Sequence, residues 1–218
     1  LDTAVCCAVN GAFFSTGQRC TASSRLVVTE GIHDRFVAAL TEAMRALRVD
    51  DARRSGTDIG PVVDETQLDQ DLSYIAIGRD QDGARLAFGG ERLNRDTPGF
   101  YMAPALFTGT HNQMRINQEE IFGPVASVMR VRDYDEALAA ANDTPFGLTS
   151  GVCTTSLKYA THFKRHAQAG MVMVNLPTAG VDPHVPFGGR KGSSLGPREQ
   201  GRYAQEFFTQ IKTAYTLS

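Results

Sequence analysis

The sequence is poor in cysteine, and its four cysteines are spaced like neither a disulfide framework nor a zinc site. Cys6 and Cys7 are adjacent, Cys20 and Cys153 stand alone, and no C-x-x-C pair occurs. Unpaired thiols are typical of a reducing compartment, so we expect a cytoplasmic protein without a metal site. Residues 1–19 also lack the basic leader and the cleavage pattern of a signal peptide.

Long apolar runs and an excess of basic charge are missing as well. No stretch approaches the ~20 apolar residues that a membrane-spanning helix needs. The 22 Lys and Arg residues against 24 Asp and Glu leave a net charge of −2. We therefore expect neither a membrane nor a nucleic acid as partner. Hydrophobic residues at 42% and charged residues at 21% are ordinary globular values, which excludes a disordered, collagen-like or coiled-coil chain.

The sequence also lacks the usual phosphate-binding loops. Neither G-x-G-x-x-G nor G-x-x-x-x-G-K-[ST] occurs, although the glycine-rich stretch 186–199 superficially resembles a phosphate loop. We interpret its glycines as permitting a tight backbone. The chain by itself therefore shows no cradle for the phosphates of a dinucleotide.

What the sequence does contain is a regular alternation of helical and strand patterns. Helices are predicted over 1–15, 31–48, 64–82, 133–142, 156–168 and 198–208, and strands over 25–29, 84–88, 100–107, 124–131, 150–154 and 171–175. This alternation predicts an α/β fold with a mostly parallel open sheet and flanking helices. The apolar strands 124–131 and 171–175 are predicted to be buried on both faces.

The two ends of the chain carry their own signals. Thr209–Thr216 alternates like a strand and needs a sheet to join, in this chain or in another copy. We therefore divide the chain into a domain of residues 1–208 and a tail strand within 209–218. Because the chain begins with Leu1 rather than Met, and inside a predicted helix, we expect a fragment of a longer protein.

The sharpest local feature is the segment Gly17–Thr21, where Cys20 follows the first predicted helix beside Arg19. A cation beside a loop cysteine favours the thiolate, which is the nucleophilic form. The spacing alone leaves a second interpretation open, because a single cysteine is more often a small buried residue.

A second feature is the acidic pair Glu119 and Glu120, just before a Gly123-Pro124 break that leads into a predicted strand. Loops at strand ends in α/β sheets commonly line ligand crevices. A carboxylate in such a loop can accept hydrogen bonds from sugar hydroxyls. A solvated acidic loop is the alternative interpretation.

Together with a third loop, these segments resemble the NAD(P)-dependent aldehyde dehydrogenase superfamily over nearly the whole chain. Phe13–Cys20 looks like the family's cysteine signature, Glu120–Pro124 like its cofactor-ribose motif and Pro186–Gly189 like its late substrate-side loop. Asn175–His184 and Gly196–Gly201 look most like the 2-oxoglutarate semialdehyde dehydrogenase branch.

The resemblance implies a chemistry centred on Cys20. Its thiolate would attack an aldehyde to give a thiohemiacetal, hydride would pass to NAD or NADP, and water would hydrolyse the resulting thioester. The Cys20 N–H would be an oxyanion donor. Glu120 would hold the nicotinamide ribose, with Phe122 near the nicotinamide. The substrate pocket would include Arg19, Thr21 and Phe187, and the charge of Arg19 suggests attraction of a carboxylated substrate.

The resemblance also shows what these residues do not supply. In the family, the Rossmann-type cofactor domain, the general-base glutamate and the oxyanion asparagine precede this region, and Asp2 is the only acid in residues 1–19. We therefore expect the chain alone to be an inactive catalytic half. The family's oligomerisation strand corresponds to Thr209–Thr216, which implies a homo-oligomer.

Two other functions stay open at this point. The chain could be a non-catalytic fragment that self-associates through an exposed face and the tail strand. It could also be a cofactor-independent thiol esterase, with His184 as the base.

The remaining histidines and cysteines receive structural interpretations. His162 and His166 have metal-binding spacing on a predicted helix but no evident third ligand, so a solvated helix face is preferred. Cys6 and Cys7 are predicted to be packing residues, and Cys153 an inert thiol on a buried strand.

Overall fold

The computed structural model describes residues 1–218 and is built around a four-stranded sheet with the strand order β1-β6-β5-β2. These strands are β1 (Arg25–Thr29), β6 (Val125–Val131), β5 (Ala105–Thr110) and β2 (Arg85–Phe88). The β1–β6 and β6–β5 pairs are parallel, and β2 runs antiparallel at the edge. The predicted mostly parallel open sheet is confirmed.

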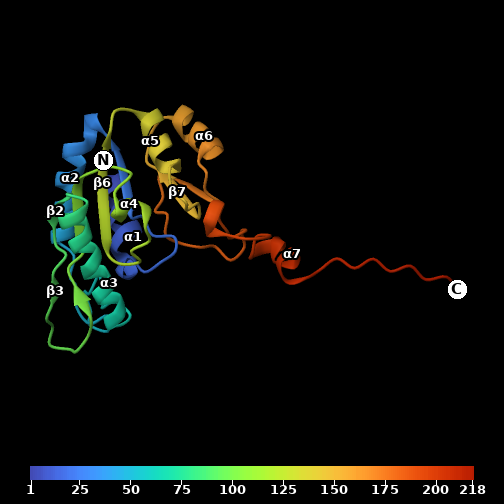
Figure 1. The fold of residues 1–218 in the computed structure, drawn as a ribbon, viewed down its shortest axis with the longest axis horizontal. Helices are drawn as coiled ribbons and strands as arrows, with labels where there is room; N and C mark the ends of the chain where they lie inside the picture. The colour runs from blue at the N-terminus through green and yellow to red at the C-terminus, as the bar shows by residue number, and fades with distance from the viewer.

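Helices cover both faces of this sheet (Figure 1). On one face, α1 (Asp2–Phe13) and α2 (Glu30–Arg45) share a core with Leu106 and Val128. On the other, α3 (Glu65–Ala76) shares a core with Phe107 and Val125. Because neighbouring residues of a strand point to opposite faces, β5 and β6 serve both cores. The predicted burial of strand 124–131 on both faces is confirmed, with Arg130 as the exposed exception.

The segment after β6 forms a second, smaller unit. It contains α5 (Tyr134–Asn142) and α6 (Leu157–His166), and β7 (Thr149–Val152) pairs in parallel with β8 (Met171–Val174). This pair forms no ladder with the main sheet. All four residues of β8 are half-buried. The prediction that strand 171–175 is buried on both faces is therefore wrong, because a two-stranded sheet has too few neighbours to cover it.

Helix starts follow local capping signals. The side chain of Asp64 accepts a hydrogen bond from the Gln67 N–H at the start of α3. Asp133 caps α5 in the same way. Such side-chain acceptors satisfy backbone donors that have no partner within the helix. The helix predicted over 64–82 ends earlier than expected, at Ala76, and continues as the wider π-type turn η2 (Ile77–Gln81).

Several short elements complete the chain. The predicted helix 1–15 ends at Phe13 and continues as the 3-10 turn η1 (Phe14–Gly17). The sequence pattern did not predict the remaining short elements as separate helices or strands. They are β3 (Arg92–Leu93), β4 (Tyr101–Met102), α4 (Arg115–Gln118) and η3 (Lys191–Ser193). No helix combines the length and apolar character that a membrane crossing requires.

The C-terminal region differs most from the prediction. The helix expected over 198–208 is reduced to η4 (Gly201–Tyr203) and α7 (Ala204–Phe208), because Glu199 pairs with Phe187 in an isolated β-bridge. Residues 209–218 form no strand and lead away from the body (Figure 1). No edge of this chain's own sheets pairs with the tail, which leaves the expected pairing with a sheet of another copy untested. The role of the tail in oligomerisation stays a prediction.

Candidate active site

The loop before Cys20 adopts an unusual backbone. Ser15, Thr16 and Gly17 have φ angles of 54°, 55° and 64°, in the left-handed region. That region is costly for a β-branched residue such as Thr16. The buried Thr16 hydroxyl donates to Gln18 Oε1 at 2.8 Å, and the Gln18 N–H donates to the Ser15 carbonyl at 3.0 Å. These bonds hold the backbone that delivers Cys20.

Cys20 itself lies in a turn between η1 and β1, and its side chain is exposed. The turn is closed by a hydrogen bond from the Ala22 N–H to the Arg19 carbonyl at 2.9 Å. The Cys20 N–H has no protein acceptor. An accessible thiol therefore stands beside a free backbone donor, which is the pairing that acyl chemistry on a cysteine requires.

The cysteine loop (residues 14–21) packs against the acidic motif (residues 119–124) through two glycines, Gly17 and Gly123. A Cβ at Gly17 would collide with the carbonyl oxygen of Gly123. This contact excludes any side chain at Gly17, independently of the strain that the positive φ of this residue would impose on one. Gln18 ties the same loop to the approach of α3, because its Oε1 accepts from the Val63 N–H at 3.0 Å. The structure thus brings the first and second sequence motifs together.

Within the acidic motif, the two glutamates have different roles. Glu119 receives hydrogen bonds from Arg115 at 2.9 Å and from the Tyr74 hydroxyl at 2.8 Å, and these partners lower the pKa of its carboxyl. Glu120 is exposed and has no hydrogen-bond or ion-pair partner. Phe122 is also exposed, with a left-handed φ of 60°. Glu120 is therefore the carboxylate of this motif without a partner, and its role as a ribose acceptor stays a prediction.

The third motif region reaches the cysteine loop through Thr178. Its hydroxyl donates to the Thr21 carbonyl at 2.7 Å and lies 2.7 Å from the Ser23 hydroxyl. Phe187 is half-buried, and its N–H donates to the Glu199 carbonyl at 2.7 Å. A Cβ at Gly170, just before β8, would collide with the carbonyl oxygen of Gly188. Phe187 is thus held near the β7–β8 unit.

Arg19 points back onto α1. Its guanidinium donates to the Asn10 carbonyl, its Nε is buried without a partner, and burial lowers its pKa. The cation that the sequence indicated as a substrate contact therefore already binds helix backbone. The unpaired Nε–H is the part of the group that still needs an acceptor.

Sequence reasoning missed the residues that support the site. Gln18 and Thr178 are such residues, and α3 contributes Gln67, Gln70 and Asp71. Asp71 carried a detectable signal, because it falls on the apolar stripe of its helix together with Leu68 and Ile75. The amide side chains carried none, since glutamine is common on exposed helix faces.

Cys6 and Cys153 differ from their predictions in exposure. Cys153 follows β7 and is exposed rather than buried on a strand. Its thiol lies beside that of Cys7, and desolvation together with Cys7 raises its pKa to about 11. The raised pKa disfavours the reactive thiolate of Cys153, as expected for an inert thiol. Cys6 is exposed, so its assignment as a packing residue is wrong, because it lies away from the α1 stripe of Ala8 and Ala12.

The histidine pair forms an aromatic stack rather than a metal site. The rings of His162 and His166 stack at 3.8 Å between centroids. The His166 Nδ1 is bound to the His162 carbonyl, and the His162 Nδ1 lies 2.9 Å from the Tyr134 hydroxyl. Nowhere in the chain do three potential metal ligands of the His, Cys, Asp or Glu type come together.

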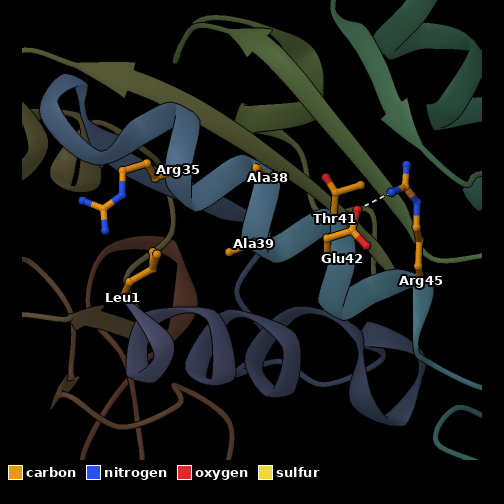
Figure 2. Close-up of a pocket in the computed structure, with 7 residues that line it drawn as sticks. All are labelled: Leu1, Arg35, Ala38, Ala39, Thr41, Glu42 and Arg45. Atoms are coloured by element: carbon orange, nitrogen blue, oxygen red, sulfur yellow. Dashed lines mark hydrogen bonds and ion pairs between the residues drawn. The ribbon is translucent and has the colours of Figure 1, made fainter.

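A surface depression of about 580 Å³ lies along α2, beside Leu1 at the start of the chain (Figure 2). Its lining consists of Leu1, Arg35, Ala38, Ala39, Thr41, Glu42 and Arg45. None of these residues belongs to the three motifs. The candidate site is therefore the exposed region around Cys20 and Glu120 rather than this depression.

Comparison with known proteins decides the family. The model of the aldehyde dehydrogenase family matches residues 1–214. The chain belongs to the aldehyde dehydrogenase family. It is 42% identical over 217 residues to an alpha-ketoglutaric semialdehyde dehydrogenase of Bacillus subtilis, and 43% identical over 211 residues to an alpha-ketoglutarate semialdehyde dehydrogenase of Haloferax volcanii.

Those alignments cover 99% and 94% of this chain but 44% and 43% of the two relatives. The chain thus spans less than half the length of the curated relatives that it matches. The family resemblance stated from the three motifs is confirmed.

Solved structures of this aldehyde dehydrogenase family agree. An NAD-dependent aldehyde dehydrogenase from Sinorhizobium meliloti superposes with a TM-score of 0.92 and 38% identity, over 97% of this chain and 41% of that one. A betaine aldehyde dehydrogenase from Staphylococcus aureus, solved with NAD+, gives 0.91 and 32%, over 95% and 41%. The fold is therefore that of the family, and the roles of individual site residues stay predictions.

Proposed function

We propose that this aldehyde dehydrogenase chain is the catalytic-domain part of an NAD(P)-dependent enzyme that oxidises an aldehyde to a carboxylate. The observation that carries the proposal is the direct packing of Gly17 on Gly123, which sets the Cys20 loop against the Glu120 motif. A nucleophile and a free ribose acceptor then share one surface. Family membership supports the same reading.

In this proposal, Cys20 is the nucleophile. Its thiolate adds to the aldehyde carbon to form a thiohemiacetal, while the Cys20 N–H donates to the developing oxyanion. After oxidation, the carbonyl carbon is held as a thioester on Cys20 until water releases the carboxylate. The accessible side chain and the unpaired N–H support both steps.

Glu120 and Phe122 fit the nicotinamide end of a cofactor. The exposed and unpaired carboxylate of Glu120 is free to accept hydrogen bonds from ribose hydroxyls, and the exposed ring of Phe122 offers an apolar face beside it. NAD or NADP, when bound, supplies the hydride acceptor. Since the chain holds no dinucleotide-phosphate motif, we expect the isolated chain to reduce no cofactor.

The substrate is proposed to be a carboxylated semialdehyde. The names of the two semialdehyde-oxidising relatives support this class. Thr21 and Phe187 are proposed to line the pocket. Arg19 is proposed to attract the substrate carboxylate through its positive charge, because its guanidinium is held on the backbone of α1. Arg19→Ala in the whole enzyme should raise KM for a semialdehyde more than for an uncharged aldehyde, and an equal loss on both would contradict this role.

A homo-oligomer is proposed through the tail. Phe208, Ile211, Tyr215 and Leu217 are 75–100% exposed, which is unusual for large apolar side chains. The same exposure favours the second candidate function, a non-catalytic fragment that self-associates. Sedimentation of the chain with and without residues 209–218 should show association only when the tail is present.

A thiol esterase has less support. His184 is exposed, and its N–H donates to Asp182 within its own loop. No hydrogen bond connects it to the cysteine loop.

Calorimetry with NAD and NADP, followed by an aldehyde-dependent reduction assay, tests the proposal that this chain carries the nucleophile but needs the upstream domain to bind and reduce the cofactor. We expect the isolated chain to bind neither cofactor tightly and to reduce neither. The enzyme that contains the upstream domain should reduce its cofactor, and Cys20→Ser should abolish that activity. Reduction by the isolated chain that disappears in Cys20→Ser would show that this half assembles a complete site.

A further inference from the structure

Asp71 is an acid in an apolar position. It lies on the buried face of α3 between Leu68 and Ile75, and its exposed fraction is 0%. Gln67 Nε2 donates to Asp71 Oδ1 at 2.8 Å, whereas Oδ2 is buried without a partner. A half-satisfied buried carboxyl is costly, so its presence calls for a compensating role.

The surroundings of Asp71 point to the acidic motif. A Cβ at Gly123 would collide with the Asp71 carboxyl, so the two groups are in close contact. The Ile121 carbonyl accepts from Gln67 Nε2 at 3.2 Å and from Gln70 Nε2 at 2.8 Å. Helix α3 therefore holds the residues on both sides of the left-handed Phe122.

No cation neutralises Asp71. Its hydrogen-bond partner on α3 is Gln67. On the acidic motif, Glu119 is paired with the cation of α4 and Glu120 is exposed. On the cysteine loop, Arg19 is bound to α1. Burial accordingly raises the pKa of Asp71 to about 7, with Gln67 opposing the rise.

We propose that Asp71 is a positioning residue for the Glu120 motif. Its carboxyl orients the Gln67 amide toward the Ile121 carbonyl, and that hydrogen bond holds the 121–123 backbone against α3. Because Gly123 also meets Gly17, the same support reaches the cysteine loop. The consequence for cofactor binding rests on the role proposed above for Glu120.

Hydrogen–deuterium exchange of the intact chain, read on peptides covering residues 119–125, tests this proposal. Asp71→Leu removes the acceptor of the Gln67 amide. We expect exchange in 119–125 to become about fivefold faster, as for one hydrogen bond of ~1 kcal/mol. Exchange in α2 should stay unchanged. Asp71→Asn keeps an acceptor oxygen and should preserve protection, and Asp69→Asn, at an exposed position of the same helix, is the matched control.

Two further readouts separate positioning from simple packing. If Asp71 acts through Gln67, the double variant Asp71→Leu/Gln67→Leu should exchange in 119–125 no faster than Gln67→Leu alone. Additive increases in the exchange rate would overturn the proposal. Asp71→Asn should keep the protection of 119–125 that Asp71→Leu loses, because it keeps the acceptor oxygen for the Gln67 amide. Equal loss of protection in both variants would also overturn it.

These measurements need no cofactor. They are therefore independent of the separate test of Glu120, in which Glu120→Gln should weaken NAD binding by the whole enzyme. If that variant binds NAD normally, the ribose role fails while the positioning result stands.

Discussion

Position 17 of the site accepts little other than glycine, since Gly17 combines a left-handed φ with a backbone contact to Gly123. The sequence placed this glycine in the cysteine signature but gave no sign of what it touches. A contact between residues more than a hundred positions apart depends on the whole fold. The sequence thus indicates Cys20 and Glu120 as candidate site residues, whereas the contact between Gly17 and Gly123 could not be predicted from it.

The first prediction uses Gly83 as a control for Gly17. Both glycines have a positive φ, of 64° at Gly17 and 70° at Gly83, but a Cβ at Gly83 would meet nothing. Gly83→Ala should cost about 1 kcal/mol for the backbone conformation. Gly17→Ala should cost at least ~3 kcal/mol, because it adds a collision with the Gly123 carbonyl. Urea unfolding measures both, and equal losses would refute the close contact.

The second prediction concerns the pH dependence of stability. The folded pKa of Asp71 is raised to about 7, well above its unfolded value, so folding favours the protonated carboxyl. That stability is fully present below about pH 4 and is lost as the pH rises through 7. Asp71→Asn should therefore exceed the wild-type chain in stability at pH 8, by at most ~4 kcal/mol, with a smaller gap at pH 5. A gap independent of pH would contradict the buried ionisation.

At the scale of elements, features that depend on nearby residues of the sequence could be predicted, whereas features that depend on neighbouring strands could not. The start of α5 was predicted from its capping residue Asp133, and the structure confirms it. The burial of β8 was predicted wrongly, because it depends on how many strands lie beside it. The tail strand stays a prediction for a similar reason, since its alternation says nothing about which sheet edge it could join.

The third prediction tests the capping of α5. Asp133→Ala removes the acceptor of the Glu136 N–H, a bond of 3.0 Å, and should lower the free energy of unfolding by about 1 kcal/mol. Asp135 lies in the first turn of the same helix but caps nothing, so Asp135→Ala is the control. Thermal unfolding should separate the two variants, and equal shifts would indicate a general charge effect.

At the scale of the whole molecule, the fold presents Cys20 differently from the other thiols. Cys20 lies in a strained loop between the acidic motif and the Thr178 loop, beside its own unpaired N–H. The pKa of the Cys153 thiol is raised, which disfavours its thiolate, and Cys6 lies exposed on α1. The fold therefore predicts that one of four cysteines is the acyl acceptor.

Acylation by an activated ester, p-nitrophenyl acetate, tests this central claim most directly. Mass spectrometry after brief exposure should locate the acetyl group on Cys20 ahead of the other three cysteines. This preference should disappear in urea, where the loop no longer holds its backbone. Labelling of Cys6 or Cys153 as fast as Cys20 in the folded chain would contradict the assignment of Cys20 as the nucleophile.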